Sequence, residues 1–154
     1  MIPHFIGIYD TIPIASGSDT YTFQRDFGFV RDDNIMVIAP KCVDVNGANI
    51  PRLLWLFLGS RLSGKNKEWS AHHDVLYAKE AIIIDCRNLN AESVTTIFEN
   101  WRELAPDYFI HQACMPKFFA DDTMRQAMIA SDSNMVKRWI AYHGVRIFGH
   151  GWWS

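Results

Sequence analysis

Large apolar residues fall on alternate positions early in the chain, and this spacing constrains the fold more than any other feature of the sequence. The alternating residues are Tyr21, Phe23, Phe27 and Phe29. A period of two is typical of a half-buried β-strand. The polar run 31–34 and the apolar run 35–39 follow, so the segment predicts a β-hairpin. Residues 1–20 mix apolar residues with Gly, Pro and Ser, which predicts an irregular or edge-strand lead-in.

The rest of the chain predicts helices, because its apolar residues recur at steps of three and four. The expected helices are 52 to about 58, 65 to about 81, one from Asn90 to Pro106, 116 to about 130, and one after the cap at 131–134. Residues 82–84 fit either a short buried strand or the end of the preceding helix. The sequence therefore predicts one α+β domain over residues 1–154, with an N-terminal β-hairpin followed by four or five helices.

Two of these helices place polar residues on an apolar stripe. In the first, His73 shares its stripe with Trp69, Leu76 and Tyr77, while Asp74 projects about a hundred degrees away. In the second, Asp121 shares its stripe with Phe118, Met124 and Met128. The inner face of the last helix is expected to consist of Val136, Trp139, Ile140, His143 and Ile147.

Charge and cysteine content exclude several classes of protein. The formal net charge is −2 and the 15 Lys and Arg are scattered, so no nucleic-acid partner is expected. The three cysteines are too few and too widely spaced for a disulfide framework or a CxxC zinc site, and we expect buried free thiols. The apolar run 53–58 is too short to cross a bilayer, so no transmembrane segment is predicted. The oligomeric state is left open.

The two inward polar residues, His73 and Asp121, could carry chemistry. A buried carboxylate is costly unless it is paired, and an imidazole is a natural partner. If the two helices pack face to face, Asp121 would accept a hydrogen bond from one ring nitrogen of His73. The other nitrogen would then take a proton from water, as in an Asp-oriented general base. A His–Asp contact that only stabilises helix packing is also common, and both interpretations stay open.

A cation site is a second hypothesis. Asp74 could hold Ca²⁺, with Asp44 or Asn46 supplying a side chain and the turn at 45–49 supplying carbonyl oxygens. The alternatives are a solvated or helix-capping role for Asp74 and ordinary turn chemistry for the other two residues.

Several motifs, taken in order, resemble a family of phage and prophage proteins of unknown function. The segment Val45-Asn46-Gly47-Ala48-Asn49-Ile50-Pro51-Arg52 is similar to its T-D-G-A-S-I-P-R signature. Three further segments, 71–77, 120–128 and 142–149, are similar to later motifs of the family, including A-x-L-H-D-x-L-Y. The resemblance runs from Tyr21 to Trp153. Asn46 replaces the family's Asp, which removes a charge from any cation site, and residues 81–116 look like an insertion.

A weaker similarity is to the phospholipases A2, which carry H-D-x-x-Y on one helix and a partnering Asp on another. It implies that His73, Asp121 and Tyr77 form a catalytic centre and that Asp74 binds Ca²⁺. Two functions follow as expectations: a phage-encoded hydrolase acting on a lipid or other ester, or a non-enzymatic virion or tail-assembly component that binds other phage proteins through Trp152, Trp153 or the insertion. Either would lie in the host cytoplasm or the virion.

Overall fold

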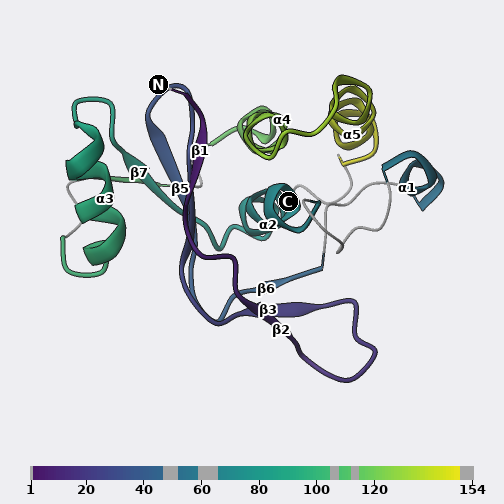
Figure 1. Ribbon diagram of the computed structural model, residues 1–154, viewed down its shortest axis with the longest axis horizontal. Helices are drawn as coiled ribbons and strands as arrows, with labels where there is room; N and C mark the ends of the chain where they lie inside the picture. The colour runs from purple at the N-terminus through teal and green to yellow at the C-terminus, as the bar shows by residue number, and fades with distance from the viewer. Residues whose placement is uncertain (1, 47–51, 59–65, 105–107, 112–114, 150–154) are drawn as a thin grey trace.

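The computed structural model describes residues 2–46, 52–58, 66–104, 108–111 and 115–149, and it is an α+β fold. Its centre is an antiparallel sheet of five strands in the order β1-β4-β5-β7-β8. A smaller antiparallel sheet has the order β2-β3-β6 and lies at one end of the larger sheet (Figure 1). The strands are β1 (His4–Gly7), β2 (Thr11–Pro13), β3 (Tyr21–Phe23), β4 (Phe27–Val30), β5 (Ile35–Ala39), β6 (Asp44–Val45), β7 (Ile82–Asp85) and β8 (Phe109–Ile110).

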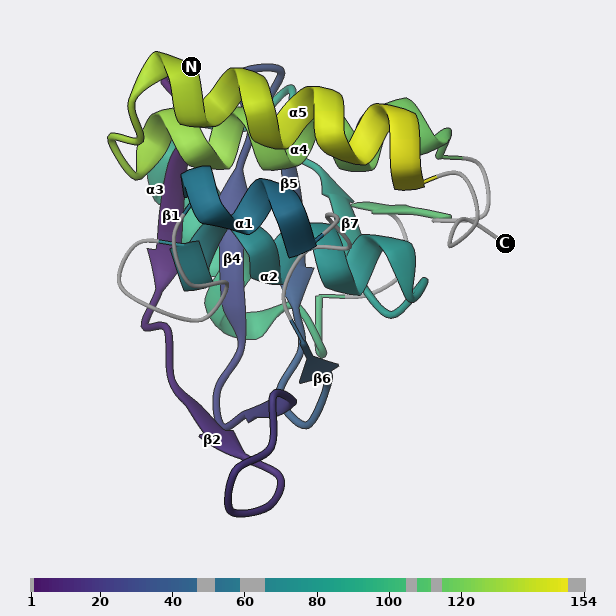
Figure 2. The same ribbon diagram turned by 90° about the vertical axis from the view of Figure 1, so that its right-hand side faces the viewer.

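Helices cover both faces of the larger sheet. One helix, α3, lies against one face, and α2 and α4 lie against the other, with α1 and α5 outside them (Figure 1). Figure 2 shows α5 running along α4, and α5 also contacts α1. The helices are α1 (Arg52–Leu58), α2 (Asn66–Tyr77), α3 (Ala91–Asn100), α4 (Lys117–Ala130) and α5 (Met135–Phe148). None of the helices in the described part of the chain is long and apolar enough to span a bilayer.

The predicted hairpin is confirmed as the pair β4 and β5. Phe29 pairs with Val37, and the turn between the strands closes when the amide of Arg31 donates to the carbonyl of Ile35. Asn34 occupies the left-handed region of this turn with φ of 58°. That conformation is tolerated better by Asn than by most side chains.

The alternating segment 21–29, predicted as one strand, forms two strands, β3 and β4, so the predicted strand is wrong in its extent. β3 belongs to the small sheet and β4 to the large one, and the chain changes sheets at Asp26. The carboxylate of Asp26 accepts hydrogen bonds from the amide of Lys41 and the indole of Trp101. These bonds satisfy backbone and side-chain donors where the strand ladder is interrupted.

The segment 81–116 contributes strands β7 and β8 to the larger sheet, and its status as an insertion relative to the family stays a prediction. Residues 82–85 form strand β7, which resolves the strand-or-helix ambiguity, and Ile83 and Ile84 are buried on opposite faces. α3 begins at the predicted cap, where the Asn90 side chain accepts from the amide of Ser93. This helix packs on the sheet through Val94 and Ile97.

The expected inner face of α5 is wrong. Val136, Trp139 and Ile147 are exposed, and the buried residues of this helix are Ala141, Gly144 and Val145. Small side chains let α5 approach its neighbours closely, so the large apolar residues remain on the outside. Phe118 of α4 is also exposed, although Met124 and Met128 on its predicted stripe are buried.

The cysteine expectation holds in part. Cys86 is a buried free thiol, whereas Cys42 is free but exposed. Cys114 lies outside the described residues, as do Trp152 and Trp153.

Candidate functional site

His73 of α2 and Asp121 of α4 face each other where these two helices pack together. The Nε2 atom of His73 lies 3.5 Å from Oδ1 of Asp121, and both side chains are fully buried. All of α2 from Trp69 to Tyr77 is buried, and Trp69 lies in one core cluster with Met124 and Met128 of α4. The structure therefore brings together the two polar residues that the sequence places on apolar faces.

Asp121 is the most heavily bonded carboxylate of the site. Its Oδ1 accepts from the hydroxyl of Tyr77 at 2.7 Å, and its Oδ2 accepts from Nζ of Lys117 at 2.7 Å. Arg146 of α5 lies 3.7 Å from the same Oδ2. Burial alone would raise the pKa of Asp121, but His73, Lys117 and Tyr77 together hold it below its usual value. The carboxylate is therefore ionised at neutral pH.

His73 lies between two carboxylates. Burial disfavours its charged form, but Asp121 and Asp74 outweigh that effect, and the pKa of His73 is raised. Its ring stacks on the ring of Tyr77 at 4.1 Å between centroids. Neither ring nitrogen has a hydrogen-bond partner of good geometry among the described residues, and Nδ1 lies 3.9 Å from Oδ1 of Asp74.

The pKa of the adjacent His72 is lowered, whereas that of His73 is raised. It is also fully buried, with its ring nitrogens 3.2 Å from the carbonyl of Phe27 and 3.3 Å from that of Glu68. Burial lowers the pKa of His72 to about 4, since no carboxylate compensates for the lost solvation. His72 is therefore neutral and anchors α2 to strand β4.

Of the three predicted metal ligands, the structure brings two together. Asp74 accepts through Oδ2 from the backbone N–H of Asn46 at 3.0 Å, and its buried Oδ1 has no hydrogen-bond partner among the described residues. Asp44 bonds instead to the hydroxyl of Thr22. The part of the chain that the structure describes holds no group of three or more His, Cys, Asp or Glu suited to a metal.

A calcium ion takes six to eight oxygen ligands. The described residues offer one buried carboxylate oxygen of Asp74, which is too few for that set. Residues 47–49, expected to supply carbonyl oxygens, lie outside the described part. Calcium binding stays a prediction.

Two members of the site, Lys117 and Arg146, are not among the residues predicted from the sequence. The spacing of Lys117 and Asp121 is i, i+4 on one helix, which is a recognisable signal for an ion pair. Arg146 comes from α5, and no local spacing connects it to Asp121. The end of α5 also accepts from Nζ of Lys117 through the carbonyl of Val145.

The C-terminal end of α5 covers this side of the site. Gly149 lies so close to Tyr77 that a Cβ atom built on it would be 2.6 Å from the phenol oxygen. The main-chain contact at Val145 and the ion pair of Arg146 lie in the same turns of the helix. Lys117 and Tyr77 consequently keep less than a tenth of their surface exposed.

Comparisons with known proteins give one result. A family model described as Protein of unknown function (DUF1353) matches residues 21–145, which include every described residue of the site except Arg146 and Gly149. No curated protein and no solved structure matches the chain.

Proposed function

The chain belongs to the DUF1353 family of proteins of unknown function, and from this premise we propose that it hydrolyses carboxylic esters at a centre formed by His73 and Asp121. The observation that carries the proposal is the environment of the His73 ring. Its Nε2 faces an ionised carboxylate, while its Nδ1 is buried without a hydrogen-bond partner among the described residues. A buried polar atom without a partner is unusual and calls for a role such as catalysis.

The chemistry proposed for this centre is general-base hydrolysis. The neutral form of His73, which prevails above its raised pKa, takes a proton at Nδ1 from a water molecule as the water oxygen attacks the ester carbonyl carbon. The imidazolium that forms is stabilised by Asp121 through Nε2, and it then returns the proton to the leaving alkoxide as the carbon–oxygen bond breaks. Tyr77 and Lys117 are positioning residues, because they hold the carboxylate of Asp121 rather than the reacting atoms.

Access to His73 requires movement of its cover. His73 and Asp121 are fully buried, so the described conformation is a closed one. Lids that open and close over an active site are common in enzymes. The end of α5 is the element that would move, because it is joined to the site by Arg146, Val145 and Gly149.

The substrate class proposed is a phospholipid or a related carboxylic ester. The support is the likeness of His73, Asp74, Tyr77 and Asp121 to the phospholipase A2 arrangement. In both, the tyrosine of H-D-x-x-Y lies one helical turn beyond the histidine. The phage motifs in the sequence support a phage-encoded protein, in the host cytoplasm or the virion.

The test measures fatty-acid release from a short-chain phosphatidylcholine and p-nitrophenolate release from p-nitrophenyl acetate. The parent protein should hydrolyse at least one of them, and His73→Gln should lower kcat by roughly 10²–10⁴. The matched control is His111→Gln, since His111 is an exposed histidine outside the His73–Asp121 contact. A parent without activity on either ester, or an equally active His73→Gln variant, would show that the proposal is wrong.

A second candidate is a non-enzymatic component of a phage particle. The complete burial of His73 favours it, because a purely structural ion cluster needs no access to solvent. In that case the parent is inactive on both esters and His73→Gln changes only stability.

A further inference from the structure

The outer surface of α5 is apolar although no described element covers it. Trp139 is 64% exposed and Ile147 is 65% exposed, and three further apolar residues of this helix are more than half exposed. Those three are Met135, Val136 and Phe148. We call the exposed side chains of residues 135–148 the α5 outer face. A patch of this kind on a helix marks a binding surface more often than an accident of packing.

The charge of α5 has a single sign. Its 14 residues include Lys137, Arg138 and Arg146 and contain neither Asp nor Glu. The chain as a whole has a formal net charge of −2, so this helix is positively charged in a protein that is negatively charged overall. Arg138 forms no ion pair with any residue in the described ranges, so its charge is available to a partner.

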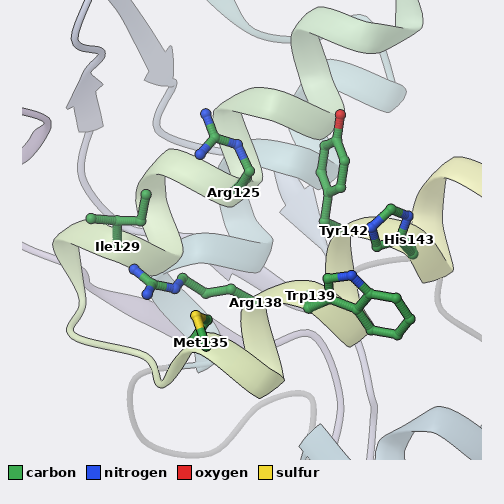
Figure 3. Close-up of a pocket in the computed structure, with 7 residues that line it drawn as sticks. All are labelled: Arg125, Ile129, Met135, Arg138, Trp139, Tyr142 and His143. Atoms are coloured by element: carbon green, nitrogen blue, oxygen red, sulfur yellow. The ribbon is translucent and has the colours of Figure 1, made fainter.

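A groove between α4 and α5 lies beside this face. It has a volume of about 360 Å³ and is lined by Arg125, Ile129, Met135, Arg138, Trp139, Tyr142 and His143. Figure 3 shows Arg138 reaching across the groove from α5 toward Ile129 on α4, with Trp139 beside it. Arg125 is paired with Asp122, so Arg138 is the guanidinium of this groove that an anionic head could take, with the Trp139 indole beside it for an apolar body.

We propose that the α5 outer face docks on an anionic phospholipid surface, with a lipid phosphate in the groove beside Arg138. Helices that lie in a membrane interface combine Lys and Arg with large apolar residues such as Trp and Phe, and α5 carries Lys137, Arg138, Trp139 and Phe148. Trp and Tyr are preferred at the level of the lipid headgroups. The inference stands on the surface of α5 and needs no activity at His73.

A second copy of the chain fits this face less well. In a two-fold dimer built on α5, the same patch meets itself, so Lys137, Arg138 and Arg146 of both copies would be brought together. Like charges brought together across an interface are unfavourable. An anionic surface, in contrast, offers Arg138 a partner of opposite charge.

The test is co-sedimentation of the full chain with phosphatidylcholine vesicles that contain or lack phosphatidylglycerol. We expect binding to the anionic vesicles to exceed binding to pure phosphatidylcholine by about tenfold or more, as two or three interfacial cations predict. Adding salt should weaken binding, because exposed charges are screened. Arg138→Gln should weaken binding to anionic vesicles about fivefold, and Trp139→Ala about tenfold.

Matched controls are available on the opposite part of the fold. Arg25→Gln removes an exposed cation outside α5, and Ile12→Ala shortens an apolar residue that is half exposed. Both should bind vesicles as the parent does. Equal binding to both kinds of vesicle, no binding to either, or unchanged binding by Arg138→Gln and Trp139→Ala would overturn the proposal. So would light scattering that shows a dimer which Trp139→Ala dissociates.

Vesicle binding and ester hydrolysis can be tested separately, so the loss of one does not imply the loss of the other. His73→Gln should bind vesicles as the parent does, since His73 is buried and outside the α5 outer face. An inactive parent that binds anionic vesicles would retain this inference while removing the enzymatic one.

Discussion

Tyr77 donates its hydroxyl hydrogen over 2.7 Å to Oδ1 of Asp121, the same oxygen that lies 3.5 Å from Nε2 of His73. Tyr77 follows His73 by four residues on α2, so one helix presents both side chains to a single carboxylate of α4. Burial, followed by the contact with Asp121, raises the pKa of Tyr77, and the phenol therefore stays protonated and acts as a donor. The carboxylate is thus fixed from two sides before any substrate is considered.

Removal of Lys117 should destabilise the protein far more than removal of Arg146. Lys117 is buried and bonds Asp121 at 2.7 Å, so Lys117→Met leaves a buried carboxylate without its main cation and should cost about 3 kcal/mol. Arg146 is 43% exposed in its side chain and lies at 3.7 Å, so Arg146→Gln should cost less than about 1 kcal/mol. Urea unfolding of the two variants measures the difference. Equal losses would contradict the assigned roles.

The neighbouring histidines should affect stability at opposite ends of the pH range. The pKa of His73 is raised in the folded state, so its stabilisation is complete below the unfolded value of about 6.5 and is lost as pH rises through the folded value. The pKa of His72 falls to about 4, so the unfolded chain binds a proton that the folded chain does not. Its burial therefore destabilises the fold increasingly as pH falls from 6.5 toward 4.

Free energies of unfolding measured from about pH 4 to about pH 9 test this contrast. His73→Gln should flatten the decline above pH 6.5, where Asp121 stays ionised in parent and variant. His72→Gln should flatten the decline on the acid side and leave the alkaline side unchanged. Parallel curves for the two variants would mean that the carboxylates around His73 do not control its protonation.

The ion network of Arg31 should be a main support of α4. This buried guanidinium bonds Asp122 at 3.2 Å and Thr123 at 2.6 Å, and it lies over the ring of Phe119. Arg31→Met should cost about 3 kcal/mol in a thermal or urea unfolding experiment, because it leaves Asp122 buried with fewer partners. The control is Arg87→Gln, whose ion pair with Asp85 is exposed. A control that loses as much as Arg31→Met would argue against this role.

The sequence predicts the His–Asp meeting but not its surroundings, for a physical reason. His73 and Asp121 each interrupt an apolar stripe, and an interrupted stripe is visible in the spacing alone. Arg146 reaches the same carboxylate from another helix, and only the packing of α5 on α4 sets that distance. The calcium prediction depends on residues 47–49, outside the described part, and is not tested.

The spacing of apolar residues also failed to predict which face of α5 is buried. Hydrophobic size favours an inward Trp139, yet the structure buries Ala141 and Gly144 and exposes the indole. Spacing identifies that a helix has two faces, but close helix packing selects the face with small residues. Likewise, the alternation of residues 21–29 continues across Asp26, where hydrogen bonds to Lys41 and Trp101 divide the strand.

Enlarging a small buried residue of α5 should therefore lower stability more than removing its large exposed indole. Ala141→Leu places a large side chain in a fully buried contact and should cost about 1–3 kcal/mol through overpacking. Trp139→Ala removes an exposed indole and should change stability by about 0.5 kcal/mol or less. Thermal unfolding of both variants measures this. A severe loss with Trp139→Ala would mean that the indole is buried in solution.

Gly149 and Tyr77 should be coupled, because the phenol oxygen occupies the space that a side chain at position 149 would need. Gly149 has φ of −76°, a conformation that Ala adopts freely, so backbone strain is not the issue. Its added Cβ would lie 2.6 Å from the phenol oxygen and 3.3 Å from Nζ of Lys117. Gly149→Ala should thus cost about 1–3 kcal/mol by pushing on the donor that holds Asp121.

A double-mutant cycle with Tyr77→Phe separates this contact from a general effect at the end of α5. Tyr77→Phe alone removes a hydrogen bond to a buried carboxylate and should cost about 1–3 kcal/mol. It also removes the oxygen that Gly149→Ala meets, so Gly149→Ala should cost less in the Tyr77→Phe variant than in the parent, by about 0.5 kcal/mol or more. Strictly additive unfolding free energies would mean that α5 does not rest on Tyr77, and the end of this helix would then lose its assigned place as the cover of the site.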